Sequence, residues 1–329
     1  MESPFVNQMT DTKKRNVLIG GGGTGTAFAI ATRLQALWHD RLRLIVTDIF
    51  DRDLVTTSLL ADAFHQVPRA DDPNFAQVLG QILEEEAIDI YIPLLNAEIR
   101  AAWTLPKTQH LDIWLAGPGP ELLDKAAADP WLQAQAVRVP QQLSDLQGRP
   151  DDETWFVKPR DGFSSRGARA LSVAEIRALD AEERAGSIIQ EICKTPEITI
   201  DSFYDAETGF TRAYCRERLE TKAGVCTKAR VFFHPELAEI ALKIGAGLGQ
   251  RGAICFQAMR GQAGWCVTDL NLRPGAGTAL TVAAGYDMLA ASYACRTGES
   301  YEHFVPEIAP DAEILVTRQY SEFVMSRRP

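Results

Sequence analysis

The pattern of apolar and polar positions divides the chain into a first third that alternates strands with helices and a remainder rich in strands. Short apolar runs at residues 16–19, 42–46 and 88–92 predict strands, and longer periodic segments at 27–37 and 74–86 predict helices. Strands that alternate with helices are typical of a parallel, doubly wound α/β sheet. We therefore expect a doubly wound domain over residues 16–117, preceded by a polar tail of residues 1–15.

The clearest strand alternation lies at residues 253–274, where two runs flank a glycine-containing turn. A turn centred on Ala263 would set Gln257 opposite Asp269 in an antiparallel hairpin. Since side chains alternate along a strand, apolar residues then share one face: Ile254, Phe256, Leu270 and Leu272. The other face is polar: Gln257, Asp269, Asn271 and Arg273. This hairpin is either a solvated edge or a platform for a metal-bound phosphate.

The polar face has the chemistry of a magnesium site. Mg²⁺ in proteins is held by one or two carboxylates, by waters and by substrate phosphates, and Asp269, Gln257 and Asn271 supply three side-chain oxygens. A guanidinium at Arg273 is suited to an anion that also touches the metal.

A glycine-rich loop, Gly20–Gly25, follows the first predicted strand and leads into the first predicted helix. A dinucleotide site would place a pyrophosphate on the helix N-terminus and a ribose on Asp48, at the end of the second strand. The loop departs from a regular Gly-x-Gly-x-x-Gly pattern, so a tight turn that needs glycine is an equal alternative.

Composition is that of a globular protein without a membrane span. The chain has 329 residues, of which 46% are hydrophobic and 24% charged, and no apolar run reaches the length of a membrane helix. Six scattered cysteines without a Cys-x-x-Cys pair predict reduced thiols and no zinc cage, hence a cytoplasmic protein. A net charge of −10 disfavours nucleic acid as a partner. We expect small-molecule substrates and allow for a homodimer.

A second set of candidates follows the breaker cluster Gly117–Pro120, which we interpret as a domain boundary. A helical segment carries Lys125, and a strand at residues 155–158 ends on Lys158. The loop of small residues after it, 161–167, has amides that can wrap phosphate oxygens beside the Lys158 ammonium. The alternative is a basic surface loop.

Downstream strands add an apolar edge and a basic stretch. A predicted strand at 187–190 runs into Glu191-Ile192-Cys193, whose backbone can read an adenine, and Glu197 lies within reach of a ribose. Five cations then fall within fifteen residues of an acidic protein: Arg216, Arg218, Lys222, Lys228 and Arg230. Such runs are usually solvated faces, but here they follow a predicted phosphate site.

In this order, the segments from residue 16 to 296 resemble an ATP-grasp ligase, in particular the carbamoyl phosphate synthetase-like branch, which includes an amino-acid ligase of the pyrrolysine pathway. The resemblance implies a Rossmann-like N-terminal domain at 16–117, a central subdomain at 118–192 and a C-terminal subdomain at 193–329. ATP would lie between the last two, with Mg²⁺, as one or two ions that Mn²⁺ can replace.

The resemblance also implies roles for individual residues. The cofactor-binding candidates are Lys125, Lys158, Ser164, Ser165, Arg166, Gly167, Gln190, Glu191, Ile192, Cys193 and Glu197. Asp269-x-Asn271-x-Arg273 resembles the family's Glu-x-Asn-x-Arg signature, with Gln257 as the further metal ligand. The catalytic candidates are Arg273 together with Lys228 or Arg230, and the substrate candidates are Arg216, Arg218 and Glu98.

Two departures from the family pattern matter. Asp269 is one methylene shorter than the usual glutamate, and Ser164-Ser165 replaces a glycine in the flap. Oxygen ligands and loop amides both survive, so the implied reaction is ATP-dependent ligation of a small carboxylic acid to an amine through an acyl phosphate. The alternatives are an NAD(P)-dependent oxidoreductase built on the glycine loop and a non-catalytic nucleotide-binding protein; helix capping is an alternative role for Glu98.

Overall fold

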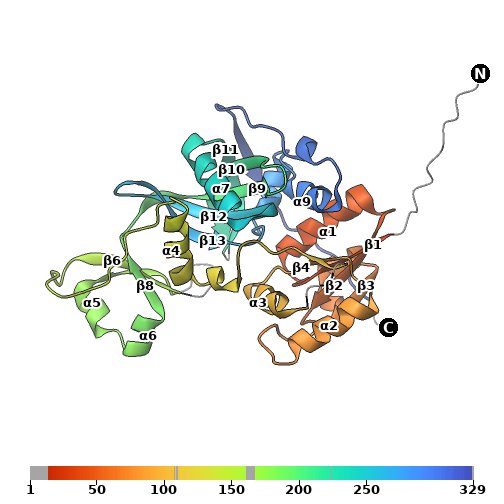
Figure 1. Cartoon of the computed structure of the whole chain (residues 1–329), viewed down its shortest axis with the longest axis horizontal. Helices are drawn as coiled ribbons and strands as arrows, with labels where there is room; N and C mark the ends of the chain where they lie inside the picture. Colours follow the sequence, from red (N-terminus) through yellow and green to blue (C-terminus); the bar gives the residue numbers. More distant parts are fainter. Residues whose placement is uncertain (1–13, 107, 109, 161–166, 223, 328–329) are drawn as a thin grey trace, which may run out of the picture.

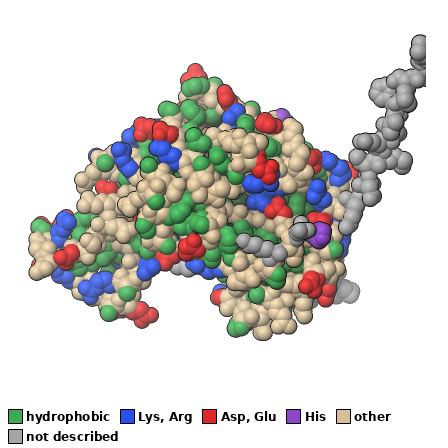
Figure 2. Space-filling view, viewed as in Figure 1, with side chains coloured by type: hydrophobic (Ala, Val, Ile, Leu, Met, Phe, Trp, Pro, Cys, Tyr) green, Lys and Arg blue, Asp and Glu red, His purple; other side chains and the backbone are tan. Residues whose placement is uncertain are grey.

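The computed structural model describes residues 14–106, 108, 110–160, 167–222 and 224–327. These residues form three sheets, which appear side by side in Figure 1 as an N-terminal lobe, a C-terminal lobe and a smaller protruding central lobe. Figure 2 shows the molecular surface hollowed between the central and N-terminal lobes. In the part of the chain described, no helix is long and apolar enough to cross a membrane.

The N-terminal lobe is the parallel sheet that the sequence predicts, with strand order β3-β2-β1-β4-β5. Its strands are β1 (Arg15–Ile19), β2 (Leu42–Asp48), β3 (Ala63–Gln66), β4 (Ile90–Ile92) and β5 (Asp112–Ile113). Its helices are α1 (Gly25–Trp38), α2 (Phe75–Glu85) and α3 (Asn96–Thr104). Thr24 caps the N-terminus of α1, because its hydroxyl accepts a 3.1 Å hydrogen bond from the amide of Ala27. The doubly wound prediction is confirmed, although it did not include the edge strands β3 and β5.

The central lobe is a small antiparallel sheet of order β7-β6-β8 with its own core. Its strands are β6 (Thr154–Pro159), β7 (Arg169–Ser172) and β8 (Ser187–Gln190). Helices α5 (Val173–Ala178) and α6 (Ala181–Ala185) belong to it, and α4 (Lys125–Ala134) precedes it. Trp155, Val157, Val173 and Ile176 are buried against one another and make a core separate from the larger ones. Residues 161–166 of the predicted flap, including Ser164, Ser165 and Arg166, lie outside the described residues.

The C-terminal lobe is an antiparallel sheet of order β13-β12-β9-β10-β11-β14. Its strands are β9 (Lys194–Asp205), β10 (Thr211–Lys222), β11 (Val225–Phe232), β12 (Arg251–Gly261), β13 (Gly264–Asn271) and β14 (Glu313–Thr317). Its helices are α7 (Pro235–Leu248), α8 (Thr278–Ala283) and α9 (Met288–Thr297). The whole is therefore one parallel sheet and two antiparallel ones, which confirms the predicted mixed α/β class.

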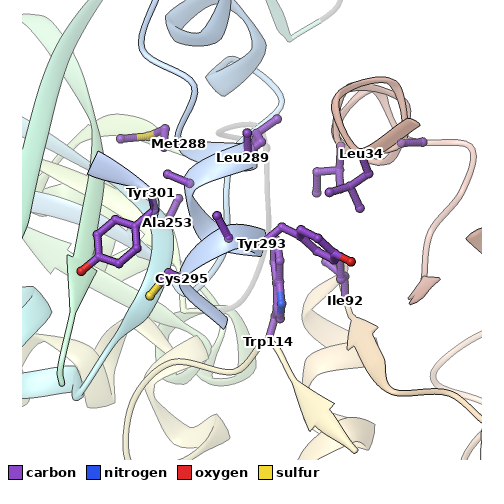
Figure 3. Packing of buried hydrophobic residues seen from close by; sticks show 14 of the residues in the cluster. Leu34, Ile92, Trp114, Ala253, Met288, Leu289, Tyr293, Cys295 and Tyr301 are labelled. Carbon is purple, nitrogen blue, oxygen red and sulfur yellow. The ribbon is translucent and has the colours of Figure 1, made fainter. Parts of the chain in front are cut away.

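The N-terminal and C-terminal lobes share one hydrophobic core, with α9 between them. Figure 3 shows Tyr293 of α9 pointing toward Leu34 of α1 and Ile92 of β4. The Tyr293 ring lies 4.7 Å, between centroids, from that of Trp38. Arg296 of α9 is buried and donates a 2.5 Å hydrogen bond to Asp112 of β5. The first and last lobes thus pack as one body, and the boundaries expected at 117 and 192 stay a prediction.

Candidate functional site

The hairpin of β12 and β13 has the predicted register for a reason that the sequence did not reveal. Gly261 pairs with Gly264, so the turn centres between Gln262 and Ala263 rather than on Ala263. A β-bulge between the Gln257 and Ala258 positions of β12 then adds one residue, Thr268, to β13. The extra residue restores the predicted pairing of Gln257 with Asp269 beyond the bulge.

The two faces of the hairpin differ as the alternation predicts. The apolar residues are all buried in the core under α7: Ile254, Phe256, Leu270 and Leu272. The polar residues remain partly exposed: Gln257, Asp269, Asn271 and Arg273. The Nδ2 of Asn271 donates a 3.1 Å hydrogen bond to Oδ2 of Asp269. The amide oxygen of Asn271 is thereby left as an acceptor next to the carboxylate.

Two lysines from outside the hairpin face this polar surface. The Nζ of Lys125, at the start of α4, lies 3.5 Å from Oδ1 of Asp269. The Nζ of Lys158, at the end of β6, donates a 2.8 Å hydrogen bond to the carbonyl of the bulge residue Thr268. Burial lowers the pKa of Lys158, and the carboxylates of Asp129 and Asp269 limit that shift. The structure therefore brings together the two lysines and the acidic hairpin that the sequence separated by more than a hundred residues.

Arg273, two residues beyond the end of β13, closes the polar face. Its Nη1 donates a 3.1 Å hydrogen bond to the carbonyl of Pro274, and its Nε is buried without a hydrogen-bond partner among the described residues. A buried guanidinium N–H without an acceptor is costly to leave unsatisfied, so this position favours an anionic ligand.

Asp129 is a member of this cluster that sequence reasoning missed. It follows Lys125 by one turn of α4, is buried, and accepts a 2.5 Å hydrogen bond from Nε2 of Gln142. Burial raises the pKa of Asp129, while the ammonium of Lys158 opposes the rise. The i, i+4 spacing of Lys125 and Asp129 was the available signal, because such a pair shares one helix face.

The segment after β8 is held in place by Glu191. The Oε1 of Glu191 accepts a 3.0 Å hydrogen bond from the Gln141 amide, and its Oε2 accepts a 3.2 Å bond from the Gln262 amide in the hairpin turn. Its carboxylate therefore ties the central lobe to the hairpin. Gln190 is buried with its Oε1 unpartnered among the described residues, and burial raises the pKa of Cys193 to about 12. Ile192 is exposed.

The family model of the ATP-grasp domain matches residues 122–277, a segment that contains the lysines, the Glu191 segment and the hairpin. The chain contains an ATP-grasp domain. A search of curated protein sequences found no match.

Solved structures of ATP-grasp enzymes have the same fold. N5-carboxyaminoimidazole synthetase from Staphylococcus aureus superposes with a TM-score of 0.66 at 14% identity, covering 88% of this chain and 79% of that one. The biotin carboxylase domain of 2-oxoglutarate carboxylase from Hydrogenobacter thermophilus, solved with MgADP and bicarbonate, gives 0.67 at 14%, covering 92% and 73%. L-amino acid ligase from Bacillus licheniformis gives 0.61 at 14%, covering 85% and 73%. The predicted ATP-grasp domain and its fold are thus confirmed.

Glu197 and Arg218 of the ATP-grasp domain form an ion pair with each other. Both side chains are about one-third exposed, and Nε of Arg218 also lies 3.4 Å from Oγ1 of Thr199. Glu197, predicted to bind the ribose, and Arg218, predicted to bind the substrate, therefore lie in contact on the adjacent strands β9 and β10.

Arg216 is placed differently from Arg218, although both lie on β10. Its side chain is only 3% exposed, and its Nε lies 3.2 Å from Oδ2 of Asp201. Asp201 also accepts hydrogen bonds of 2.7 and 2.5 Å from Thr278 and Thr281. Although burial opposes it, this ion pair raises the pKa of the Arg216 guanidinium. Its surroundings favour a structural role, anchoring the segment that follows Arg273.

Lys228 and Arg230 lie on β11, which is separated from β13 by three strands of the sheet, roughly 19 Å along its surface. Lys228 is paired with Glu220 at 3.0 Å, and Arg230 with Glu217 at 2.6 Å and with Glu313. The structure thus brings neither cation to the polar face of the hairpin.

The glycine loop of the N-terminal lobe is occupied by the protein's own carboxylates. Oδ2 of Asp48 accepts a 2.7 Å hydrogen bond from the Gly23 amide. Glu98 accepts from the amides of Gly21, Leu94 and Leu95, the last two at 3.0 and 3.2 Å. Burial raises the pKa of Glu98. Because these amides are already bonded to carboxylates, the geometry argues against a pyrophosphate on this loop. The hydrogen bonds that Glu98 accepts from Leu94 and Leu95, before the first turn of α3, are those expected for helix capping, the alternative role of Glu98.

Proposed function

We propose that the protein is an ATP-dependent ligase that joins a small carboxylic acid to an amine through an acyl phosphate. The observation that carries the proposal is the meeting of Lys125 and Lys158 with the polar face of the hairpin at Asp269 and Thr268. Two ammonium groups beside an oxygen-rich surface and a guanidinium suit a nucleotide triphosphate, whose charge they would share with a metal ion.

The donor set of the hairpin fits Mg²⁺. Asp269 supplies a carboxylate, and Gln257, which pairs with Asp269 across the hairpin, and Asn271 supply amide oxygens. One carboxylate with neutral oxygens is sufficient for Mg²⁺, because substrate phosphates and waters complete its six-coordinate shell. When bound by these residues, the ion would supply positive charge that neutralises the charge developing on the transferred group.

The protein's own residues have positioning roles in this reaction. Lys125 and Lys158 would bind the phosphates of ATP, and the strand end at Gln190 to Cys193 would receive the adenine. Arg273, whose Nε has no hydrogen-bond partner in the described part of the chain, would hold the transferred phosphoryl group while a carboxylate oxygen of the acid attacks the γ-phosphorus and ADP leaves. The amine then attacks the acyl carbon and phosphate departs, so the protein need not supply a nucleophile.

Turnover assays test the proposal directly. ADP and phosphate release are measured with ATP and Mg²⁺ over a panel of carboxylic acids, each with and without a panel of primary amines. We expect release that requires both an acid and an amine, and an amide product by mass spectrometry. If no ADP is released with any acid, with or without an amine, the result would contradict a ligase and favour a non-catalytic nucleotide-binding protein.

A thermal-shift experiment separates the ligase from the oxidoreductase alternative. A ligand at 100 times its Kd stabilises the native state by about 2.7 kcal/mol, which is a readily measured shift in Tm. We expect stabilisation by ATP with Mg²⁺ and none by NADH or NADPH, because the Gly21 and Gly23 amides are bonded to Glu98 and Asp48. The reverse result would favour the oxidoreductase.

A further inference from the structure

A cavity of about 260 Å³ lies at the carboxyl edge of the N-terminal sheet, apart from the lysines and hairpin described above. Its floor is the glycine loop at Gly21 and Gly23, and its walls include Phe50, Phe75 and Leu95. The strand order β3-β2-β1-β4-β5 changes direction between β1 and β4, and ligands of open α/β sheets bind at such a point. The cavity lies there, since Gly21 follows β1 and Leu95 follows β4.

The charge of the cavity is negative. Asp48 and Glu98 line it, both less than a tenth exposed, and among its described lining residues there is no lysine or arginine. Both carboxylates accept hydrogen bonds from backbone amides, which hold them in place, and no ion pair with a lysine or arginine is found for either among the described residues. A cation is the complementary partner for this floor, and a phosphate or carboxylate would be repelled.

The walls of the cavity are apolar and leave hydrophobic side chains exposed at its rim. Phe50 is 54% exposed, Leu95 41% and Ile49 39%, whereas Phe75 is buried behind them. An occupant with an apolar body would cover the three rim side chains, which gains free energy by removing their surface from water.

A residue that lines this cavity, Leu95, is the sequence neighbour of one that lines a second cavity beside Arg273. This neighbour, Leu94, lines the second, smaller cavity together with Arg273 and Pro274. An occupant that extends past Leu95 toward Leu94 would therefore approach the guanidinium that closes the polar face of the hairpin.

We propose that this cavity binds the amine substrate, and that the substrate is a primary amine with an apolar body. Its ammonium group lies against Asp48 and Glu98, and its body packs on Phe50, Phe75 and Leu95. Calling this amine a substrate rests on the proposed ligase function. Its binding in the cavity does not depend on turnover and can be measured without it.

Direct binding without ATP tests the site. Isothermal titration calorimetry with 2-phenylethylamine measures the predicted class, 3-phenylpropionate reverses the charge while keeping the ring, and ethanolamine keeps the charge without the apolar body. We expect 2-phenylethylamine to bind most tightly and 3-phenylpropionate most weakly. Tighter binding of the acid, or equal binding of ethanolamine, would overturn the proposal.

Two substitutions locate the binding. Leu95→Ser removes an apolar wall but supplies a favoured residue at the N-cap of α3, so the helix is not weakened. Phe50→Ser removes a rim side chain. We expect each substitution to raise the Kd of 2-phenylethylamine about ten-fold, which is the usual effect of losing an apolar contact in a pocket. Leu54→Ser, at a residue 71% exposed that does not line the cavity, is the matched control.

The outcomes distinguish the two proposals. Unchanged amine affinity in Leu95→Ser and Phe50→Ser, with each variant shown to fold by circular dichroism, would overturn the cavity assignment. Amine binding that follows the expected pattern in a protein that shows no turnover with any acid would leave the cavity assignment standing and overturn the ligase proposal instead.

Discussion

The ammonium of Lys158 donates its 2.8 Å hydrogen bond to Thr268, the extra residue that the bulge inserts into β13. A lysine from the central lobe is thus bonded to the backbone of the C-terminal lobe next to Asp269. The contact crosses the gap in which the nucleotide is expected, so the position and charge of Lys158 affect both sides of the site.

The lowered pKa of Lys158 predicts an alkaline limit on ATP binding. Because burial favours the neutral amine, Lys158 loses its proton below the ordinary lysine value of 10.5, and the attraction for phosphate is lost with it. The KM for ATP should therefore rise as pH increases toward that value, measured in steady-state assays. Lys158→Arg, which stays charged over this range, should remove the pH-dependent rise even if it lowers kcat.

Lys243→Arg is the control for this effect, since Lys243 lies on α7, which packs on the apolar side of the hairpin, and forms an i, i+4 pair with Glu239. A rise in KM that persists unchanged in Lys158→Arg would mean that another group titrates.

Removing the side-chain oxygen of Asn271 should abolish turnover without unfolding the protein. Asn271 is partly exposed and bonds only to Asp269 among the contacts described for its side chain. We expect Asn271→Ala to lower kcat by at least about 100-fold, or ~2.7 kcal/mol in the barrier, with Tm nearly unchanged. Gln262→Ala, in the exposed turn of the same hairpin, should retain activity. A normal rate in Asn271→Ala would refute its role as a metal ligand.

The two arginines of β10 should give opposite results. Arg216→Ala leaves Asp201 as a buried charge without its ion-pair partner and should cost about 3–5 kcal/mol of unfolding free energy. Arg218→Ala breaks a partly exposed pair and should cost about 1 kcal/mol or less. Urea denaturation measures both, and equal costs would contradict the assigned burial roles. For the properly folded Arg218→Ala protein, a raised KM for the acid would support the predicted substrate contact.

The shared core predicts that the N-terminal and C-terminal lobes unfold together. Tyr293 of α9 is buried between them, and Tyr293→Ala should destabilise the protein by about 3–5 kcal/mol by leaving a cavity. Tyr320→Ala, at an exposed tyrosine near the C-terminus, is the control. Hydrogen exchange should show α1 and β12 losing protection together in the variant. Loss confined to one lobe would show that the two are energetically independent.

Local patterns predicted the parts of the site that depend on nearest neighbours. The alternation on either side of the glycine turn predicted the two faces of the hairpin. The turn is centred half a residue before the predicted position, Ala263, and the bulge at Thr268 compensates for this shift, so the predicted pairing of Gln257 with Asp269 was right. A bulge leaves no mark in the alternation when its extra residue, here a threonine, is acceptable on either face. The prediction of the register was therefore correct without its cause being known.

Features that depend on distant packing were not accessible in the same way. Nothing in the vicinity of Asp129 indicates that Lys158 will lie beside it, and the sequence Arg216-x-Arg218 does not show that one guanidinium is buried and the other exposed. The short polar strand β3 has too little apolar character to stand out, since it is an edge strand. The shared core likewise arises only when α9, late in the chain, packs on α1.

The carboxylates on the glycine loop have an evolutionary consequence. Gly21 and Gly23 retain the backbone geometry of an anion-binding turn, but Glu98 and Asp48 supply the anions from within the chain. A relative that lost one of these two acids would expose an amide of the loop without any change of fold. The two acids together thus keep the loop from acting as the anion site that its glycines would otherwise form.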